Sequence, residues 1–340
     1  MIPVPVPARQ PAAWQALWRD AIRDPAELLS LVGLDALAAR VSAPASAHFP
    51  LRVPRGYAAR MRHGDPADPL LRQVLPFDDE DRMVPGFGLD AVGDGAAKGG
   101  TGVIHKYDGR ALLIATGSCA IHCRYCFRRH FPYAEETAAA AGWASALDYL
   151  RANPTVREVI LSGGDPLSLA TLKLAELTDA LRGLPQVARL RIHTRLPVVL
   201  PERVDTPFLD WISALPWPIA MVVHANHANE IDSAVRAAFA DLRRAGVHLL
   251  NQAVLLRGVN DTLDAQAHLA EALFDAGALP YYLHVLDRVH GTAHFEVPED
   301  EALALHRALH ARLPGYLLPR LAREEPGMAG KTLLGPAAAS

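Results

Sequence analysis

The chain has 340 residues, of which 50% are hydrophobic and 21% are charged, and its formal net charge is −3. A chain of this length and composition can bury a large core. It has no excess of basic residues that would indicate nucleic acid or a membrane surface as a partner. No apolar run reaches the ~18 residues needed to span a bilayer. The first twenty residues lack the basic start and apolar run of a signal peptide, so we expect a soluble cytoplasmic protein with no nucleic-acid or membrane partner.

Residues 1–100 are predicted to form a mainly helical N-terminal extension. Apolar residues recur at helical spacing in "WQALWRDAIRD" (14–24) and in "PAELLSLVGL" (25–34). The glycine-rich segment "GLDAVGDGAAKGG" (88–100) is predicted to be a loop.

Residues 101–313 contain short, β-branched runs that alternate with longer helical patterns. This alternation predicts parallel βαβ units and favours an α/β fold, a partial (βα)6 barrel of the TIM type. A doubly wound open sheet would give the same alternation, and in either fold the chemistry collects at the C-terminal ends of the strands. The strand candidates are 111–116, 157–162, 189–194, 218–224, 247–256 and 281–286, and the helical patterns are 138–152, 169–183, 206–214, 229–245, 262–276 and 298–312.

All three cysteines of the chain, Cys119, Cys123 and Cys126, follow directly after the first strand candidate, with the spacing C-x3-C-x2-C. Three thiolates this close can hold three irons of a [4Fe–4S] cluster. The fourth iron would then be open to the amine and carboxylate of S-adenosylmethionine. A structural zinc completed by His122 or His130 is an alternative, although zinc sites usually use C-x2-C pairs. Three incidental buried thiols would leave the absence of any other cysteine unexplained.

The motif "SGGDPL" (162–167) follows the second strand candidate. Gly163 and Gly164 would let a ligand approach the backbone closely, and Asp165 can accept a hydrogen bond from an ammonium. A plain strand-to-helix turn, capped by Asp165 or Ser168, is the alternative interpretation.

These motifs together resemble the radical S-adenosylmethionine enzymes. The resemblance implies that Tyr125 packs on the adenine and that Gly163, Gly164 and Asp165 bind the methionine amino group. The segment "HANHANE" (224–230) follows the fourth strand candidate, and His224, with Asn226 and His227, is expected to line the same site. A helix cap by Asn226 or Asn229 is the alternative there.

Nearly the whole chain is similar to the lysine 2,3-aminomutase family, and most of all to the shorter bacterial branch that serves elongation factor P. The segments that carry this resemblance include "HKYDGRALLIATGSC", "CRYCFRRHFPYAE", "LLNQAVLLRGVND", "PYYLHVLDRVHGTAHF" and "YLLPRLARE". The family's C-terminal glycine-rich segment ends in the lysine that binds pyridoxal phosphate, and "REEPGMAGKTLLG" (323–335) places Lys331 there. On local sequence alone, Lys331 would be a solvated lysine in a flexible tail, within a separate C-terminal segment, residues 314–340.

The resemblance also implies the remaining site residues. Lys106 and Arg110 match the two cations on the cofactor phosphate, although Lys106 replaces an arginine and lacks its bidentate geometry. Arg128 matches the arginine that binds the substrate carboxylate, which suits a planar guanidinium. Asp287 and Glu324 match the acidic pair that binds the lysine ε-ammonium. Taken alone, Arg128 could be a solvated loop charge and each acid a member of a surface ion pair.

The implied activity is the radical isomerisation of free L-lysine to β-lysine, as the R enantiomer, with a [4Fe–4S] cluster, S-adenosylmethionine and pyridoxal phosphate as cofactors. The implied partners are an external electron donor of the flavodoxin or ferredoxin type and a ligase that attaches β-lysine to elongation factor P. An aminomutase for another amino acid and a non-catalytic iron–sulfur electron carrier are the alternative functions.

Overall fold

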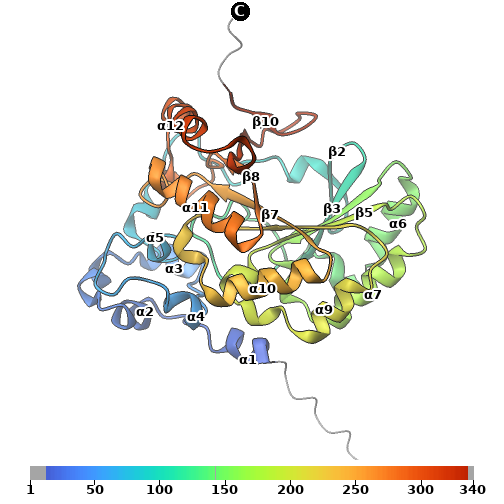
Figure 1. The fold of residues 1–340 in the computed structure, drawn as a ribbon, viewed down its shortest axis with the longest axis horizontal. Coiled ribbons are helices and arrows are strands. Elements are labelled where there is room, and N and C mark those ends of the chain that lie inside the picture. Colours follow the sequence, from blue (N-terminus) through green and yellow to red (C-terminus); the bar gives the residue numbers. More distant parts are fainter. Residues whose placement is uncertain (1–12, 142, 336–340) are drawn as a thin grey trace, which may run out of the picture.

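The computed structural model describes residues 13–141 and 143–335, and six parallel strands form the centre of its sheet (Figure 1). Neighbouring strands in the chain are hydrogen-bonded neighbours throughout, without the reversal of order that defines a doubly wound sheet. The predicted α/β fold with six βα units is therefore confirmed, as a curved sheet that stays open. The six strands are β3 (Arg110–Thr116), β4 (Glu158–Gly163), β5 (Arg189–Thr194), β6 (Ile219–Val223), β7 (His248–Val254) and β8 (Leu279–His284).

Four further strands that were not predicted extend the sheet to ten strands. β1 (Lys98–Gly100) and β2 (Val103–Tyr107) add to β3 in antiparallel pairs. β9 (Arg320–Arg323) is parallel to β8, and the two-residue β10 (Thr332–Leu333) is antiparallel to β9. The sheet therefore runs across the predicted boundaries at residues 100 and 313.

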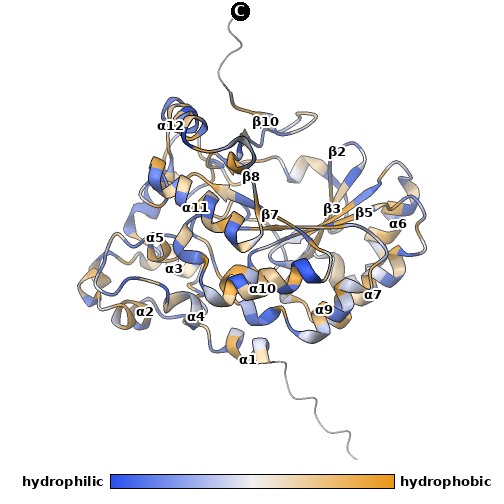
Figure 2. Ribbon diagram, viewed as in Figure 1, coloured by the Kyte–Doolittle hydropathy of each residue, from blue (hydrophilic) through white to orange (hydrophobic). Residues whose placement is uncertain are grey.

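Helices follow the strands and cover the outside of the sheet (Figure 1). Their boundaries have local causes: the side chains of Asp205, Asp232 and Thr262 accept hydrogen bonds from the first turns of α9, α10 and α11, and Gly277 ends α11 with a φ of 88°. In Figure 2 the strands are mainly hydrophobic, while the helices carry hydrophilic residues outward. The helices are α6 (Ala144–Ala152), α7 (Thr171–Leu181), α8 (Leu196–Val199), α9 (Thr206–Ser213), α10 (Ser233–Arg244), α11 (Leu263–Ala276) and α12 (Glu299–Arg312).

One predicted helix, 138–152, is interrupted. Residues 138–141 form a 3₁₀ turn, and α6 starts only at Ala144. Between them the buried Trp143 has a φ of 69°, a conformation that a continuing helix does not allow.

The N-terminal region contains the predicted helices, which group together in Figure 1. They bury Trp14, Leu28, Leu29, Tyr57 and Leu70 in the same core as the sheet. Residues 1–12, on which the expectation about a signal peptide partly rests, lie outside the described residues. No helix in the described ranges has the length and apolar character to cross a membrane. The helices are α1 (Ala13–Arg19), α2 (Pro25–Leu31), α3 (Ala43–His48), α4 (Arg55–Ala58) and α5 (Pro69–Arg72).

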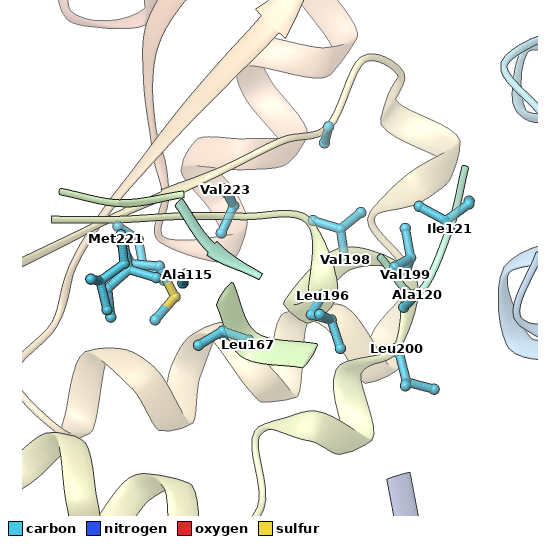
Figure 3. Packing of buried hydrophobic residues seen from close by; sticks show 14 of the residues in the cluster. Ala115, Ala120, Ile121, Leu167, Leu196, Val198, Val199, Leu200, Met221 and Val223 are labelled. Carbon is cyan, nitrogen blue, oxygen red and sulfur yellow. The ribbon is translucent and has the colours of Figure 1, made fainter. Parts of the chain in front are cut away.

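Apolar packing anchors the loop after β3. Ala120 and Ile121 of this loop lie near α8, from which Leu196, Val198 and Val199 point toward them (Figure 3). All five side chains are buried, so the cysteine-bearing loop is fixed on the C-terminal end of the sheet rather than exposed as a free loop.

Candidate active site

The three cysteines occupy the loop directly after β3, at the end of the sheet where the chemistry was predicted. All three are free thiols of intermediate exposure. The amide of Cys126 donates to the carbonyl of Cys123 at 3.0 Å, which closes a tight turn between these two residues. Burial raises the pKa of Cys126 to about 11 and that of Cys119 well above its usual value. Binding of a metal here therefore has to displace thiol protons.

The geometry argues against the zinc alternative. Among the described residues, no group of three or more His, Cys, Asp or Glu side chains could hold a single metal ion. His122 Nδ1 instead lies 2.7 Å from the carbonyl of Pro50, and His130 Nδ1 lies 2.8 Å from His48 Nε2. A [4Fe–4S] cluster does not require convergence on one point, because each thiolate binds a different iron.

A buried arginine that the sequence did not reveal supports the cysteine loop. Arg195 Nη1 donates to Cys123 Sγ at 2.7 Å, and Arg195 Nη2 lies 2.7 Å from Glu230 and 2.8 Å from Gln73. This hydrogen bond ties the cysteine loop to the segment that follows β5. No local motif marks these residues, because their contacts join distant parts of the chain.

The glycine pair allows two backbone segments to lie close together. A Cβ on Gly163 would lie 2.7 Å from the carbonyl oxygen of Thr116, and one on Gly164 would lie 2.5 Å from that of Ser118. Gly163 also has a φ of 117°, which other residues rarely adopt. The glycines therefore let the end of β4 pack against the cysteine loop, and their part in binding the methionine amino group stays a prediction.

Asp165 acts as a cap, as the alternative interpretation had it. Its carboxylate accepts four hydrogen bonds, from the Thr194 hydroxyl and from the amides of Leu167, Arg195 and Leu196. These bonds use both oxygens and fix the loop after β5. Burial raises the pKa of Asp165 even so.

The other residues expected around S-adenosylmethionine differ in how far structural contacts already occupy their side chains. The ring of Tyr125 meets Phe295 edge-on, with the ring centroids 6.3 Å apart, and Arg195 lies 5.7 Å from its centroid. Asn226 is buried in hydrogen bonds with Gln73 and with the backbone, and His227 caps a short 3₁₀ turn. Of the three residues after β6, His224 alone is not used in such a structural hydrogen bond within the described part of the chain.

Lys331 and Glu324 form an ion pair in the C-terminal segment. Lys331 Nζ lies 2.7 Å from Glu324 Oε2, and the Tyr107 hydroxyl donates to Glu324 Oε1 at 2.6 Å. Lys331 Nζ also lies 5.6 Å from the centroid of the Tyr282 ring. Although burial disfavours its charge, the ion pair with Lys331 keeps the pKa of Glu324 below its usual value.

Asp287 and Glu324 line the same cavity, which has a volume of about 530 Å³. Burial raises the pKa of Asp287 to about 7, although the positive charge of Lys331 opposes the rise. The structure thus brings the two predicted acids together with Lys331 and gives them different proton affinities. The cavity is also lined by charged residues that include Asp90, Arg288, Glu296, Glu299, Arg323 and Glu325.

The predicted cations Arg128 and Lys106 share one buried carboxylate that was not predicted. Asp94 Oδ2 lies 2.7 Å from Arg128 Nε, and Asp94 Oδ1 lies 2.7 Å from Lys106 Nζ. Arg128 Nη1 donates to the Ser162 hydroxyl, and Lys106 donates to the carbonyl of Val92. Arg128 therefore keeps Nη2 without a hydrogen-bond partner within the described ranges.

The structure does not bring Arg110 into direct contact with the other predicted residues. It begins β3, at the opposite end of this strand from the cysteines, and its guanidinium lies 4.6 Å from the centroid of the Tyr107 ring. Tyr107 in turn binds Glu324, so Arg110 adjoins the group only through this tyrosine.

Three histidines face the lysine end of the site: His284 in β8 is buried, while His193 in β5 and His224 are half-buried. His193 and His284 were not predicted. The rings of His193 and His224 lie 5.9 Å apart, and burial lowers the pKa of all three histidines, that of His224 to about 4. Nε2 of His193 and Nε2 of His284 are buried without a hydrogen-bond partner in the described structure. These unsatisfied nitrogens could form hydrogen bonds with a polar group that is bound at the Lys331 amine.

Comparison with known proteins identifies close relatives. The chain is 49% identical over 325 residues to an L-lysine 2,3-aminomutase from Escherichia coli, covering 94% of both chains. It is 42% identical to one from Haemophilus influenzae, covering 96% of both, and 34% identical to one from Clostridium subterminale, covering 82% of this chain and 67% of that one. No family model matches the chain. A radical SAM methyltransferase from Sphaerobacter thermophilus has a TM-score of 0.47 at 16% identity over 65% of this chain, a likeness too distant for any argument.

Proposed function

Because the chain belongs to the L-lysine 2,3-aminomutase family and is an isomerase, we propose that it converts free L-lysine to β-lysine by radical chemistry. One observation above all supports this substrate. Glu324 already binds the ε-ammonium of a lysine side chain, that of Lys331, and Glu324 and Asp287 line the same cavity. The same acids can bind the identical ε-ammonium of free lysine once Lys331 is engaged elsewhere.

In this proposal Cys119, Cys123 and Cys126 bind a [4Fe–4S] cluster and Lys331 binds pyridoxal phosphate. S-adenosylmethionine would lie beside Tyr125 and His224. Gly163, Gly164 and Asp165, at the end of β4, would lie on the side of its methionine amino group. When bound, these cofactors supply the radical and the π-system that lets the nitrogen migrate.

The chain's own residues would bind and orient the substrate. Arg128 Nη2 is free to donate to the substrate carboxylate while Asp94 keeps the guanidinium in place. Asp287 and Glu324 bind the distal ammonium, so the substrate is held at both ends and its β-carbon is placed between them. The neutral imidazoles of His193 and His284 offer hydrogen bonds without adding charge. Lys106, and Arg110 beside Tyr107, would bind the cofactor phosphate.

The product is proposed to be (R)-β-lysine, passed to a ligase that modifies elongation factor P. This part rests on the similarity of segments such as "CRYCFRRHFPYAE" and "PYYLHVLDRVHGTAHF" to the bacterial branch of that function. A cytoplasmic location is proposed as well, because free thiols and their metal clusters persist in a reducing compartment.

The direct test is anaerobic incubation with L-lysine, S-adenosylmethionine, pyridoxal phosphate and dithionite, followed by chiral analysis of the product. We expect (R)-β-lysine, and we expect Glu324→Gln to weaken lysine use by ~30-fold or more. Removal of one partner of a buried charge pair costs on the order of 2–5 kcal/mol. Cleavage of S-adenosylmethionine without substrate should hardly change, because it does not involve the ammonium.

Glu296→Gln is the matched control, since Glu296 lines the same cavity but pairs with the exposed Arg288. Equal lysine kinetics in Glu324→Gln and wild type would contradict the assignment of Glu324. If another amino acid reacts in place of lysine, the substrate is wrong. If no amino acid reacts, the result would favour the alternative function, a non-catalytic electron carrier.

Lysine binding should depend on pH through Asp287. Below its pKa of about 7 this carboxyl is protonated and cannot balance the ammonium, so the affinity for lysine should rise as the pH increases from 6 to 8. The slope should approach tenfold per pH unit below pH 7. Equilibrium binding measurements should find this slope in the wild type and a flat profile in Asp287→Asn. An unchanged slope in that variant would show that another group is responsible. His193, His224 and His284, whose pKa values are lowered, stay neutral over this range.

A further inference from the structure

A basic depression lies beside the cysteine loop, apart from the cavity that Asp287 and Glu324 line. Its volume is about 260 Å³, and it is lined by residues of α1, by the segments after α1 and before α4, and by the loop after β3: Gln15, Trp18, Arg19, Arg23, Arg52 and Ser118. Three of these six residues are arginines. We call the surface formed by Trp18, Arg19, Arg23 and Arg52 the arginine face.

The arginines of this face have no charge partner. None of the ion pairs among the described residues includes Arg19, Arg23 or Arg52, and residues 1–12 contain no acidic side chain. The acids in the same region are used elsewhere: Asp20 and Glu27 bind Arg55, and Asp24 caps α2. Burial, together with the charge of Arg23, lowers the pKa of Arg52. The positive charges of Arg19, Arg23 and Arg52 thus lie close together, and no acidic side chain of the described residues balances them.

The arginine face contacts the backbone of a predicted cluster ligand. Trp18 Nε1 donates to the carbonyl of Cys119 at 3.3 Å, and Arg52 Nη1 donates to the same oxygen at 3.0 Å. The guanidinium of Arg52 also lies 5.5 Å from the centroid of the Trp18 ring. A partner on this face would therefore be separated from the cysteine loop by a single layer of side chains.

We propose that the arginine face is the docking site for an acidic one-electron carrier protein that reduces the iron–sulfur cluster. This inference rests on the proposed function, in which each activation requires one external electron. The reduced carrier gives up one electron and becomes oxidised, and the cluster is reduced by one electron. Complementary charge brings an acidic carrier to this side of the molecule although the chain as a whole carries a net charge of −3.

Other anions fit the arginine face less well. Arg19 and Arg23 are exposed at its rim, whereas Arg52 is half-buried, so the three cations are spread over a surface rather than gathered on one small ion. A nucleic acid would require basic surface over a longer path than three arginines provide. The contacts with Cys119 also select a redox partner over a purely electrostatic one.

The test compares wild-type holoenzyme with the double variant Arg19→Glu, Arg23→Glu. Both side chains are exposed, and neither donates a hydrogen bond to the cysteine loop in the described structure. The control, Arg82→Glu with Arg307→Glu, changes two exposed arginines that do not line the depression, and each double variant moves the formal net charge from −3 to −7. A purified bacterial flavodoxin is the probe, with binding measured by calorimetry at low and high salt.

Wild type and control should bind flavodoxin with an affinity that falls with salt, and the arginine-face variant should bind at least tenfold more weakly. Reduction of the cluster by reduced flavodoxin, followed by stopped-flow absorbance, should slow by a similar factor. Reduction by dithionite should be equal in all three proteins, because this small reductant needs no docking. Equal flavodoxin binding by the arginine-face variant and the control would overturn the proposal, as would salt-dependent binding of RNA or inorganic phosphate that the variant loses while flavodoxin binding persists.

The proposed function can fail separately. If dithionite-reduced wild type forms no β-lysine, the isomerisation is wrong. The flavodoxin measurements still decide whether the arginine face binds a carrier.

Discussion

Lys331→Ala should lose lysine isomerisation entirely and keep its iron–sulfur cluster. The variant removes the amine that is proposed to bind pyridoxal phosphate, and no other lysine lies in the C-terminal segment, residues 314–340. Folding should be preserved, because Glu324 keeps Tyr107 and Lys106 as partners. The visible absorbance of the lysine-bound cofactor should be absent, and borohydride should not fix the cofactor to the protein.

The control is Lys173→Ala, which removes an exposed lysine that pairs with Glu176 on α7. It should retain wild-type activity and cofactor content. If Lys331→Ala turned over at the normal rate without an added amine, the role assigned to Lys331 would be wrong.

Replacement of any one of the three cysteines by alanine should remove both the cluster and all activity. Each thiolate is assigned to a separate iron, and the chain contains no other cysteine that could substitute. Iron and sulfide analysis of anaerobically reconstituted protein, with the visible spectrum, measures the loss. Ser118→Ala tests the same loop beside Cys119 without removing a ligand, and it should keep its iron. Full iron content in the triple cysteine variant would refute this site.

The six central strands were predictable because β-branched residues, as in "REVILS" and "RLRIHT", or the two tyrosines of β8 mark them. The edge strands lack such a signal. β1 consists of Lys98, Gly99 and Gly100, which on local preference form a loop, and it is a strand only because β2 provides hydrogen-bond partners. β10 has two residues and depends on β9 in the same way. Pairing with a neighbouring strand in the folded protein makes these segments strands, and the local sequence does not indicate this pairing.

The residues of the candidate site likewise fall into those that the sequence predicted and those that only the folded structure reveals. Cysteine spacing and similarity to a family predicted the thiols, Lys331 and the two acids Asp287 and Glu324. They did not reveal Asp94, which lies in a segment predicted to be a loop and yet binds Arg128 and Lys106. Arg195 was missed as well, because its link to Cys123 spans 72 residues. Such contacts arise from the folded arrangement and carry no spacing of their own.

The weak pairing of β10 has a consequence for how Lys331 works. This strand has two residues at the edge of the sheet, and the segment before it contains Gly327 and Gly330, around which an added Cβ would meet no atom within 4 Å. A short, loosely packed edge can detach at a small fraction of the free energy that unfolds the whole domain. If Lys331 has the proposed role, it would leave Glu324 and return within one turnover, while the central strands beside the cysteine loop stay in place. In the proposed function, the chain would separate a reversible covalent anchor, Lys331, from the loop that holds the cluster, and would give each the local stability that its task requires.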